Sequence, residues 1–151
     1  EQVSAGIADF RGAGRRFEIL GKCNGAVIAD DYAHHPAELK VTLEAAKELH
    51  YKRVWAVFQP FTYSRTAMLL EDFAKVLPIA DKVVMTEIMG SREKNTYNIY
   101  TKDLAAKIDG SVWFPTFEEV ADYLRQNITE GDLVITLGCG DVYKIAKMLI
   151  S

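Results

Sequence analysis

Val54-Trp55-Ala56-Val57-Phe58 is apolar at every position. A strand with one face in water alternates apolar and polar residues, whereas a strand covered on both faces reads as a continuous apolar run. Residues 82–86 and 132–137 contain further apolar runs, and each precedes a polar or glycine-containing segment. These stretches predict strands of one sheet, and residues 54–58 predict a strand that is covered on both faces.

Downstream of residue 58, strand patterns alternate with loop and helix patterns. We expect a loop at residues 59–64, a polar surface loop at 87–98 and a short strand at 112–114. Four helices are expected. The first begins after residue 64, and the second runs from its cap Thr101 through Ile108. The third runs from Phe117 to about Gln126 and follows the capping-box pair Thr116 and Glu119, and the fourth follows residue 141. Their expected apolar positions are Leu69, Leu70, Phe73, Val76, Val142, Ile145, Ala146 and Leu149.

Upstream of residue 54, the pattern predicts a hairpin and then a helix. Residues 17–21 begin with the alternation of a half-buried strand, which Leu20 breaks. Asn24-Gly25 is a strong hairpin signal, and residues 26–29 suit the second strand. Pro36 suits the first turn of a helix. That helix has apolar residues at helical spacing, at Leu39, Leu43, Ala46 and Leu49.

This order of elements predicts an α/β fold. The expected architecture is Rossmann-like: a mostly parallel sheet with helices on both faces and an N-terminal β-hairpin. The chain has 151 residues, enough for one domain with a real core. We expect residues 1–14 to be a linker from a longer protein and residues 15–151 to be the domain itself.

The composition limits the possible partners. Hydrophobic residues make up 49% of the chain and charged residues 26%, as in folded soluble proteins. The net charge is −3 and the basic residues are scattered, which argues against nucleic acid as a partner. No apolar run approaches the roughly 20 residues that span a bilayer, so no membrane partner is expected. Cys23 and Cys139 are far apart in sequence and suggest a reducing cytoplasm.

Three loops with unusual residues are predicted to meet at one edge of the sheet. They are residues 30–36, 59–65 and 138–141, each of which follows a strand. Ligands of open α/β sheets bind at the carboxyl ends of the strands. This edge is therefore the expected ligand-binding edge.

Residues 30–36 read Asp-Asp-Tyr-Ala-His-His-Pro and crowd two carboxylates, a phenol and two imidazoles into one turn. A carboxylate at a strand end can hold a ribose diol or a cation, and a neutral histidine can accept a proton. Alternatively, Asp31 or His35 only caps the helix that starts at Pro36. We expect capping by one residue and ligand binding by the others. No metal site is expected, because no further His or Cys is evidently placed to complete one.

Two arginines and a glycine turn are the other candidates. Arg65 precedes a helix and could clamp a carboxylate, although a solvated arginine is the simpler alternative. Arg16 or its neighbour Arg15 could reach a phosphate, or the two could form a solvated basic pair. Residues 138–141, Gly-Cys-Gly-Asp, suit an anion or a tight turn but lack the third glycine of a dinucleotide fingerprint. The chain has no P-loop sequence.

The four motifs together resemble the third domain of UDP-N-acetylmuramate–L-alanine ligases, in the Mur ligase family. Residues 30–36 resemble the family pattern D-D-Y-[AG]-H-H-P, and residues 12–18 resemble G-x-x-R-R-F-E. Residues 57–66 resemble V-F-Q-P-H-x-[YF]-[ST]-R-T, and residues 138–141 are similar to G-A-G-D. The motifs are collinear and span nearly the whole chain.

The resemblance implies an ATP-dependent amide ligase of peptidoglycan precursor synthesis, and thus of cell wall biogenesis, cell shape and cell division. Its substrates would be UDP-N-acetylmuramate, L-alanine and ATP with Mg²⁺, the last two bound mainly by a central domain. The implied roles are ATP binding by Arg16 and Asp31, alanine binding by Arg65, His34 and Tyr32, and catalysis beside the reacting carboxylate by His34. The isolated domain is expected to be inactive.

The chain departs from the family pattern at Phe61 and Thr62, where many members have His and Arg. The absence of the second arginine leaves Arg65 with fewer partners on a substrate carboxylate. A related ligase that attaches a recycled tripeptide to the sugar is an alternative, although Gln59 and residues 63–66 favour the alanine enzyme. A free-standing Rossmann-like nucleotide-binding module is a second alternative.

Overall fold

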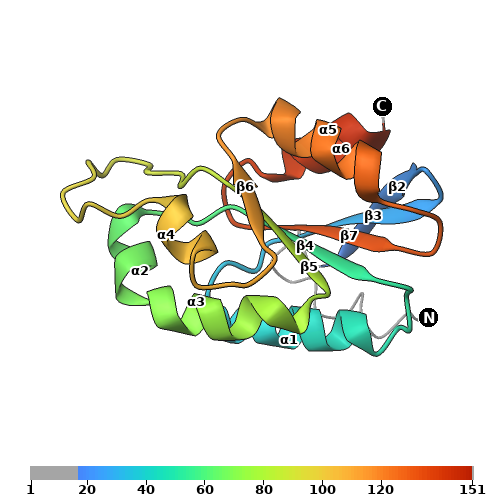
Figure 1. The fold of residues 1–151 in the computed structure, drawn as a ribbon, viewed down its shortest axis with the longest axis horizontal. Helices are drawn as coiled ribbons and strands as arrows, with labels where there is room; N and C mark the ends of the chain where they lie inside the picture. The colour runs from blue at the N-terminus through green and yellow to red at the C-terminus, as the bar shows by residue number, and fades with distance from the viewer. Residues whose placement is uncertain (1–16, 151) are drawn as a thin grey trace.

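The apolar run at residues 54–58 lies near the centre of a six-stranded sheet in the computed structural model, which describes residues 17–150 (Figure 1). The strands are β2 (Glu18–Cys23), β3 (Ala26–Asp31), β4 (Val54–Phe58), β5 (Lys82–Thr86), β6 (Val112–Phe114) and β7 (Leu133–Leu137). The helices are α1 (Pro36–Lys47), α2 (Tyr63–Met68), α3 (Leu70–Val76), α4 (Thr101–Ala105), α5 (Phe117–Asn127) and α6 (Tyr143–Ile150), and η2 (Leu77–Ile79) is a 3₁₀ turn.

The strand order is β2-β3-β7-β4-β5-β6. Only β2 pairs antiparallel, with β3, and the other neighbours are parallel. The last strand, β7, therefore inserts between β3 and β4. This arrangement confirms the predicted α/β fold with its N-terminal hairpin.

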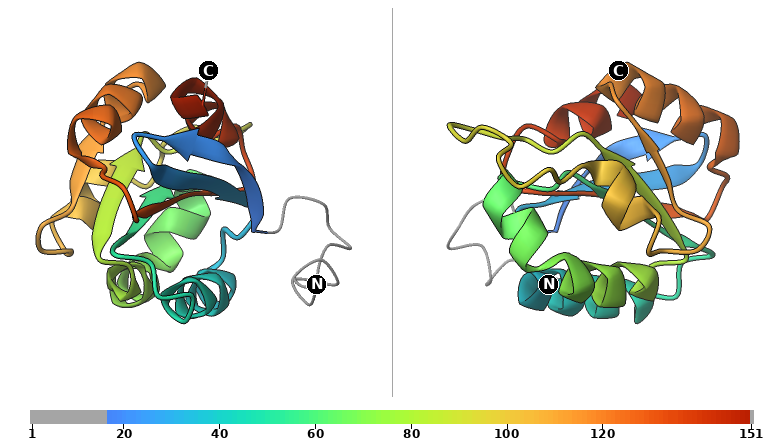
Figure 2. Two further views of the ribbon diagram at one scale, coloured as in Figure 1. Left: turned by 90° about the vertical axis from the view of Figure 1, so that its right-hand side faces the viewer. Right: turned by 60° about the vertical axis from the view of Figure 1, so that its left-hand side comes forward.

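Both faces of the sheet are covered, and β4 shows how. Ala56 and Phe58 pack in the core on the side of α1, α3 and α4. Trp55 and Val57 pack in the core on the side of α5 and α6. Figures 1 and 2 show these two helical layers on either side of the strands. Because neither face meets water, every residue of β4 is buried and the strand has no polar position.

The hairpin follows its sequence signals closely. Asn24 and Gly25 have φ angles of 55° and 83°, the left-handed values that a two-residue turn of this kind needs. The register between β2 and β3 shifts between Ile19 and Gly21. That irregularity falls at Leu20, the residue that breaks the alternation in the sequence.

Two expectations for the helices are wrong in detail. Leu49 is 46% exposed, because α1 ends at Lys47 and the chain turns away at His50, where φ is 63°. The helix after residue 62 is interrupted at Leu69, where φ is −107° and ψ 18°. After this break, the residues of α3 that face the core differ from those expected for one continuous helix. Phe73 is buried, whereas Leu69, Leu70 and Val76 are only partly buried.

The cap of α4 is also different from the expectation. Thr101 is the first residue of the helix, and its hydroxyl donates to the Thr86 carbonyl at 2.9 Å. Tyr100 precedes the helix, and its N–H donates to Asp103 Oδ2 at 2.8 Å. The helix ends at Ala105, short of Ile108. By contrast, Thr116 caps α5 as predicted, accepting from the Glu119 N–H at 3.2 Å.

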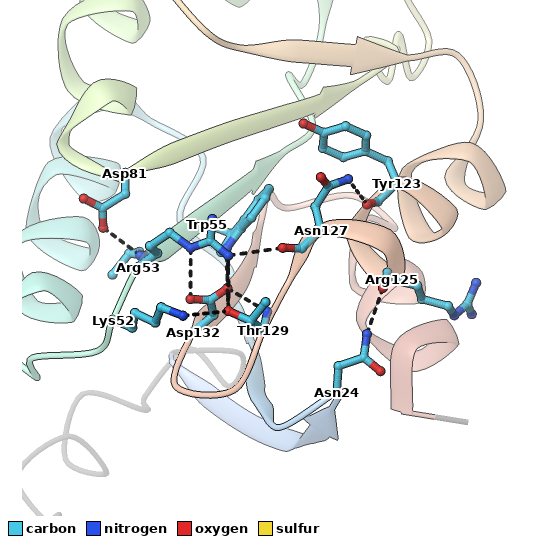
Figure 3. A network of polar contacts seen from close by, with 11 residues as sticks. Asn24, Lys52, Arg53, Trp55, Asp81, Tyr123, Arg125, Asn127, Thr129 and Asp132 are labelled. Atoms are coloured by element: carbon cyan, nitrogen blue, oxygen red, sulfur yellow. Dashed lines mark hydrogen bonds and ion pairs between the residues drawn. The ribbon is translucent and has the colours of Figure 1, made fainter.

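A polar network joins the amino ends of β4 and β7, at the edge opposite the three candidate loops (Figure 3). The fully buried Asp132 carboxylate accepts two hydrogen bonds from Arg53, from Nε at 3.2 Å and Nη2 at 2.8 Å. It also accepts from Trp55 Nε1 at 3.0 Å and from the Thr129 N–H at 2.9 Å. These bonds fix the starts of both central strands. Within residues 17–150, every helix is too short or too polar to cross a bilayer.

Candidate functional site

The three candidate loops meet at the carboxyl ends of β3, β7 and β4, as the sequence predicted. The Gly138 N–H donates to the Asp31 carbonyl at 3.3 Å, and the Gln59 N–H donates to the Leu137 carbonyl at 3.1 Å. Gln59 Nε2 donates to Asp141 Oδ1 at 3.0 Å. The parallel register of the three strands therefore brings the loops together.

Asp31 is buried, with 2% of its surface exposed. Its Oδ2 accepts from the Phe17 N–H at 2.9 Å and from the Thr42 hydroxyl at 3.3 Å, and its Oδ1 accepts from the Ala33 N–H at 2.8 Å. These bonds tie the chain before β2 and the start of the next loop to the end of β3. Asp31 thus has a structural role in this arrangement, and its role toward the ATP ribose stays a prediction.

His34 lies beside Tyr32, with the two rings edge to face at 5.5 Å between centroids. His34 Nδ1 is 3.1 Å from the Tyr32 carbonyl oxygen and 3.5 Å from Glu38 Oε1. Both neighbours are acceptors, so Nδ1 carries the proton in the neutral ring and Nε2 carries the lone pair. The side chain is 21% exposed. His34 is therefore held with an accepting nitrogen available to a ligand.

His35 caps α1, which was one of the two readings of this segment. Its Nδ1 accepts from the Ala37 N–H at 3.2 Å. The Glu38 carboxylate reaches back and accepts from the backbone N–H groups of His34 and His35, each at 3.2 Å. Asp31 does not act as the cap. The local structure thus separates the two histidines: His35 starts the helix and His34 presents its ring.

A pocket of about 400 Å³ lies beside α2. Among the described residues, those that line it are His35, Thr62, Ser64, Arg65, Met68, Leu69 and Glu93. Tyr32 and His34 are not in this set, and the expectation that they share a cleft with Arg65 stays a prediction. The pocket instead joins Arg65 to His35 and to Glu93, which the sequence did not single out.

The Arg65 side chain is partly exposed, and its guanidinium lies over the Phe61 ring at 5.9 Å. A cation near an aromatic face is attracted by the ring quadrupole. Within residues 17–150, no carboxylate lies within 4.0 Å of the Arg65 nitrogens. The Phe61 ring thus supports the guanidinium and leaves its hydrogen-bond donors for a ligand.

Thr62 starts α2 with a φ of 65°, an unusual conformation for a β-branched residue. Its hydroxyl accepts from the Arg65 N–H at 3.3 Å, and its N–H donates to the Met89 carbonyl at 2.8 Å. Its carbonyl accepts from the Thr66 hydroxyl at 2.7 Å. Thr62 therefore fixes the turn that holds Arg65, rather than adding a second cation.

Glu93 reaches the pocket from the loop at residues 87–98. Its carboxylate accepts from the Ser64 N–H at 2.9 Å and from the Ser64 hydroxyl. These hydrogen bonds, chiefly the one from the hydroxyl, lower the pKa of Glu93, and the positive charge of Arg65 adds to the effect. Glu93 is therefore an anion at neutral pH. Sequence reasoning missed it because it lies in a polar loop with no local pattern.

Gln59 is a second residue that the sequence did not assign. It is 4% exposed, and its Oε1 is buried without a hydrogen-bond donor among residues 17–150. A Cβ on Gly140 would lie 2.6 Å from this oxygen, although Gly140 does not have a left-handed φ. Space at Gly140 is thus limited by the Gln59 side chain, which would have to shift to admit a Cβ, and not by the backbone conformation.

Gly140→Ala should destabilise the domain by about 1–3 kcal/mol, because the new methyl group displaces Gln59 and breaks its bond to Asp141. Urea unfolding of the 151-residue chain measures the loss. In a Gln59→Ala background, the same glycine substitution should cost much less. An equal cost in both backgrounds would show that Gln59 is not the obstacle.

Comparisons with known proteins show the family of this chain. Residues 15–140 match the family model described as Mur ligase, glutamate ligase domain. The chain belongs to this family.

Curated relatives of this Mur ligase domain have one name in common. A UDP-N-acetylmuramate–L-alanine ligase of Acetivibrio thermocellus is 45% identical over 99% of the chain, and one of Alkaliphilus metalliredigens is 47% identical over 99%. The chain covers 33% of the length of each of these relatives. It therefore spans about a third of the curated proteins that it matches.

Solved structures show the same domain. A UDP-N-acetylmuramate–alanine ligase from Thermotoga maritima matches 94% of the chain with a TM-score of 0.72 and 26% identity, over 30% of its own length. A murein peptide ligase from Psychrobacter arcticus matches 90% with a TM-score of 0.70 over 29% of its length. Its identity is 22%, so this second likeness concerns the fold alone.

Two further points about this Mur ligase domain concern Arg16 and metal ions. Arg16, the predicted contact to the ATP phosphates, lies outside the described residues. In the part of the chain that the structure describes, no three His, Cys, Asp or Glu side chains gather to hold a metal ion.

Proposed function

We propose that this chain is the amino-acid-binding domain of a UDP-N-acetylmuramate–L-alanine ligase, an ATP-dependent enzyme of peptidoglycan precursor synthesis in the cytoplasm. The observation that carries the proposal is the Arg65 guanidinium, which faces a pocket and has no carboxylate partner within residues 17–150. A guanidinium in such a place binds a substrate carboxylate through charge-assisted hydrogen bonds. The relatives that span the whole chain support alanine as the source of that carboxylate.

The reaction joins the lactyl carboxylate of the sugar to the amine of L-alanine. ATP would phosphorylate the carboxylate to an acyl phosphate and leave as ADP, and the amine would then attack the acyl carbon and expel phosphate, the good leaving group. Mg²⁺ would offset the phosphate charge. Arg65 would hold the alanine carboxylate and so orient the amine. His34, whose Nε2 can accept a hydrogen bond, would lie near the reacting carboxylate, with Tyr32 beside it. Holding two reactants in place removes much of the entropic barrier.

ATP and Mg²⁺ would bind mainly to parts of the full-length enzyme outside this chain. Both Asp31 oxygens already accept hydrogen bonds, from Phe17, Ala33 and Thr42. A carboxylate oxygen can accept more than one hydrogen bond, so capacity for a ribose hydroxyl remains. The contacts of Asp31 to the ATP ribose and of Arg16 to the phosphates therefore remain proposals.

The proposed domain comprises residues 15–151, with residues 1–14 as a linker to the central ATPase domain. The family match, which begins at residue 15, supports this boundary. By itself, the domain would be inactive because no P-loop sequence is present.

The direct test is phosphate release by the full-length enzyme with ATP and UDP-N-acetylmuramate. L-Alanine should stimulate release far more than the tripeptide L-alanyl-γ-D-glutamyl-diaminopimelate does. Preference for the tripeptide would replace the proposal by the recycling ligase. Release that depends on neither acceptor would refute both readings.

His34→Ala in the full-length enzyme should lower kcat by about 10²-fold or more, the size of effect expected when a positioned acid–base group is lost. The KM for ATP should stay nearly constant. His50→Asn serves as the control, because His50 is exposed just after α1 and outside the pocket lining, and asparagine tolerates its φ of 63°. A kcat unchanged in His34→Ala would remove His34 from the site.

A further inference from the structure

The candidate pocket contains two opposite charges that do not pair with each other. Arg65 and Glu93 both line it, and the positive charge of Arg65 acts on the Glu93 carboxylate. No ion pair within 4.0 Å joins them in the described part of the chain. Two unlike charges that face one small space without touching leave room for a ligand with charges of its own.

Glu93 is held in place by the chain around the pocket. The Ser64 N–H and hydroxyl both donate to its carboxylate, one to each oxygen. Each carboxylate oxygen can accept more than one hydrogen bond, so capacity for a ligand donor remains. Ser64 is the neighbour of Arg65 in α2, which ties the anion and the cation to the same turn. The separation of the charges is therefore built into the structure.

The rest of the pocket wall suits a small apolar group. Met68 and Leu69 line it, and Met68 is 78% exposed. The Thr62 hydroxyl, which also lines the pocket, accepts a hydrogen bond from the Arg65 N–H. A cation, an anion and an apolar wall within about 400 Å³ match the three parts of a small zwitterionic amino acid.

We propose that Glu93 binds the ammonium group of the amino-acid substrate while Arg65 binds its carboxylate. This inference rests on the proposed function and names a second recognition residue of the same pocket. A ligand that carries only one of the two charges would leave Arg65 or Glu93 unpaired. The pair thus selects α-amino acids over simple carboxylates and simple amines.

Glu93 is a binding residue in this account and not the base of the reaction. Its hydrogen bonds to Ser64 lower its pKa, so its carboxylate is a poor proton acceptor. The ammonium group therefore gives up its proton to another acceptor before the amine attacks. Glu93 fixes which way the amine points until then.

The test uses the full-length ligase with the variants Glu93→Gln, Glu93→Asp and Ser64→Ala. Glu93→Gln should raise the KM for L-alanine at least about tenfold and leave the KM for ATP and for the UDP-sugar within twofold. Glu93→Asp should recover part of the loss, because it restores the charge. Glu118→Gln, an exposed residue of α5 on the opposite side of the sheet, is the matched control and should change nothing.

Two one-charge inhibitors separate recognition from simple support of the loop. Propionate has the carboxylate without the amine, and ethylamine has the amine without the carboxylate. Glu93→Gln should weaken inhibition by ethylamine and preserve inhibition by propionate, while Arg65→Lys should do the reverse. If Glu93→Gln and Ser64→Ala weakened both inhibitors equally, Glu93 would only anchor Ser64 and the inference would be overturned.

The outcomes also distinguish this inference from the proposed function. An alanine KM within twofold of wild type in Glu93→Gln overturns the inference while the enzyme remains an alanine ligase. Wild-type turnover with a different amino acid refutes the proposed function. In that case, the KM for that amino acid is compared between the wild type and Glu93→Gln, and this comparison decides the role of Glu93.

Discussion

Asp132→Ala should lower the free energy of unfolding of the 151-residue chain by about 3–5 kcal/mol, the usual cost of removing one partner of a buried ion pair. The substitution takes the acceptor away from Arg53, from the buried Trp55 Nε1–H and from the Thr129 N–H. Asp132 is fully buried and joins the starts of the two central strands (Figure 3). Urea unfolding followed by the tryptophan signal measures the loss.

The same carboxylate should make stability depend on acid. Burial alone would raise the pKa of Asp132, but the hydrogen bonds from Arg53, Thr129 and Trp55 outweigh burial and lower it below 3.8. A lowered pKa in the folded state stabilises the fold fully above the unfolded pKa, and the contribution disappears as pH falls through the folded value. Stability should therefore drop below about pH 4, and Asp132→Ala should flatten that drop.

Asp122→Asn is the control for this prediction, because Asp122 pairs with Arg125 on the exposed face of α5. Exposed pairs of this kind contribute about 0–1 kcal/mol. If Asp132→Ala cost no more than Asp122→Asn, the network at the amino ends of β4 and β7 would not stabilise the sheet.

Arg65→Ala in the full-length ligase should raise the KM for L-alanine by about 30- to 150-fold, which corresponds to about 2–3 kcal/mol for a lost charge-assisted clamp. The effect should be large because Arg65 is the one arginine or lysine among the described residues that line the pocket. The KM for ATP should change little. Steady-state phosphate release at varied alanine concentration gives both constants.

Arg92→Ala is the control. It removes one positive charge from the loop at residues 87–98 and leaves the pocket lining unchanged. It therefore tests whether the loss of any nearby positive charge, and not of Arg65 itself, raises the alanine KM. This variant should keep an alanine KM near the wild-type value. An alanine KM unchanged by Arg65→Ala would contradict the assigned role and, with it, the carboxylate clamp.

The sequence predicted those parts of the fold that depend on local patterns. The apolar run of β4, the Asn24-Gly25 turn and the Thr116 cap each follow from residues within a few positions of one another. The meeting of the three loops followed from the rule that parallel strands end at one edge. The insertion of β7 between β3 and β4 did not follow, because strand order is set by packing across the whole sheet.

The candidate site was predicted less completely for the same reason. Arg65 and the histidines carry unusual chemistry in short motifs, so the sequence pointed to them. Glu93 contacts Ser64 from 29 residues away, and Gln59 contacts Asp141 from 82 residues away. No periodicity or spacing connects such pairs. Only the folded chain shows that His35 and Glu93 line a pocket together with Arg65.

The most direct test of the central claim is a crystal structure of the full-length ligase with UDP-N-acetylmuramate, a non-hydrolysable ATP analogue and L-alanine. The alanine carboxylate should lie within hydrogen-bond distance of the Arg65 guanidinium, about 2.7–3.2 Å, with its ammonium group toward Glu93. Alanine bound away from the pocket beside α2, with Arg65 contacting no part of it, would contradict the account.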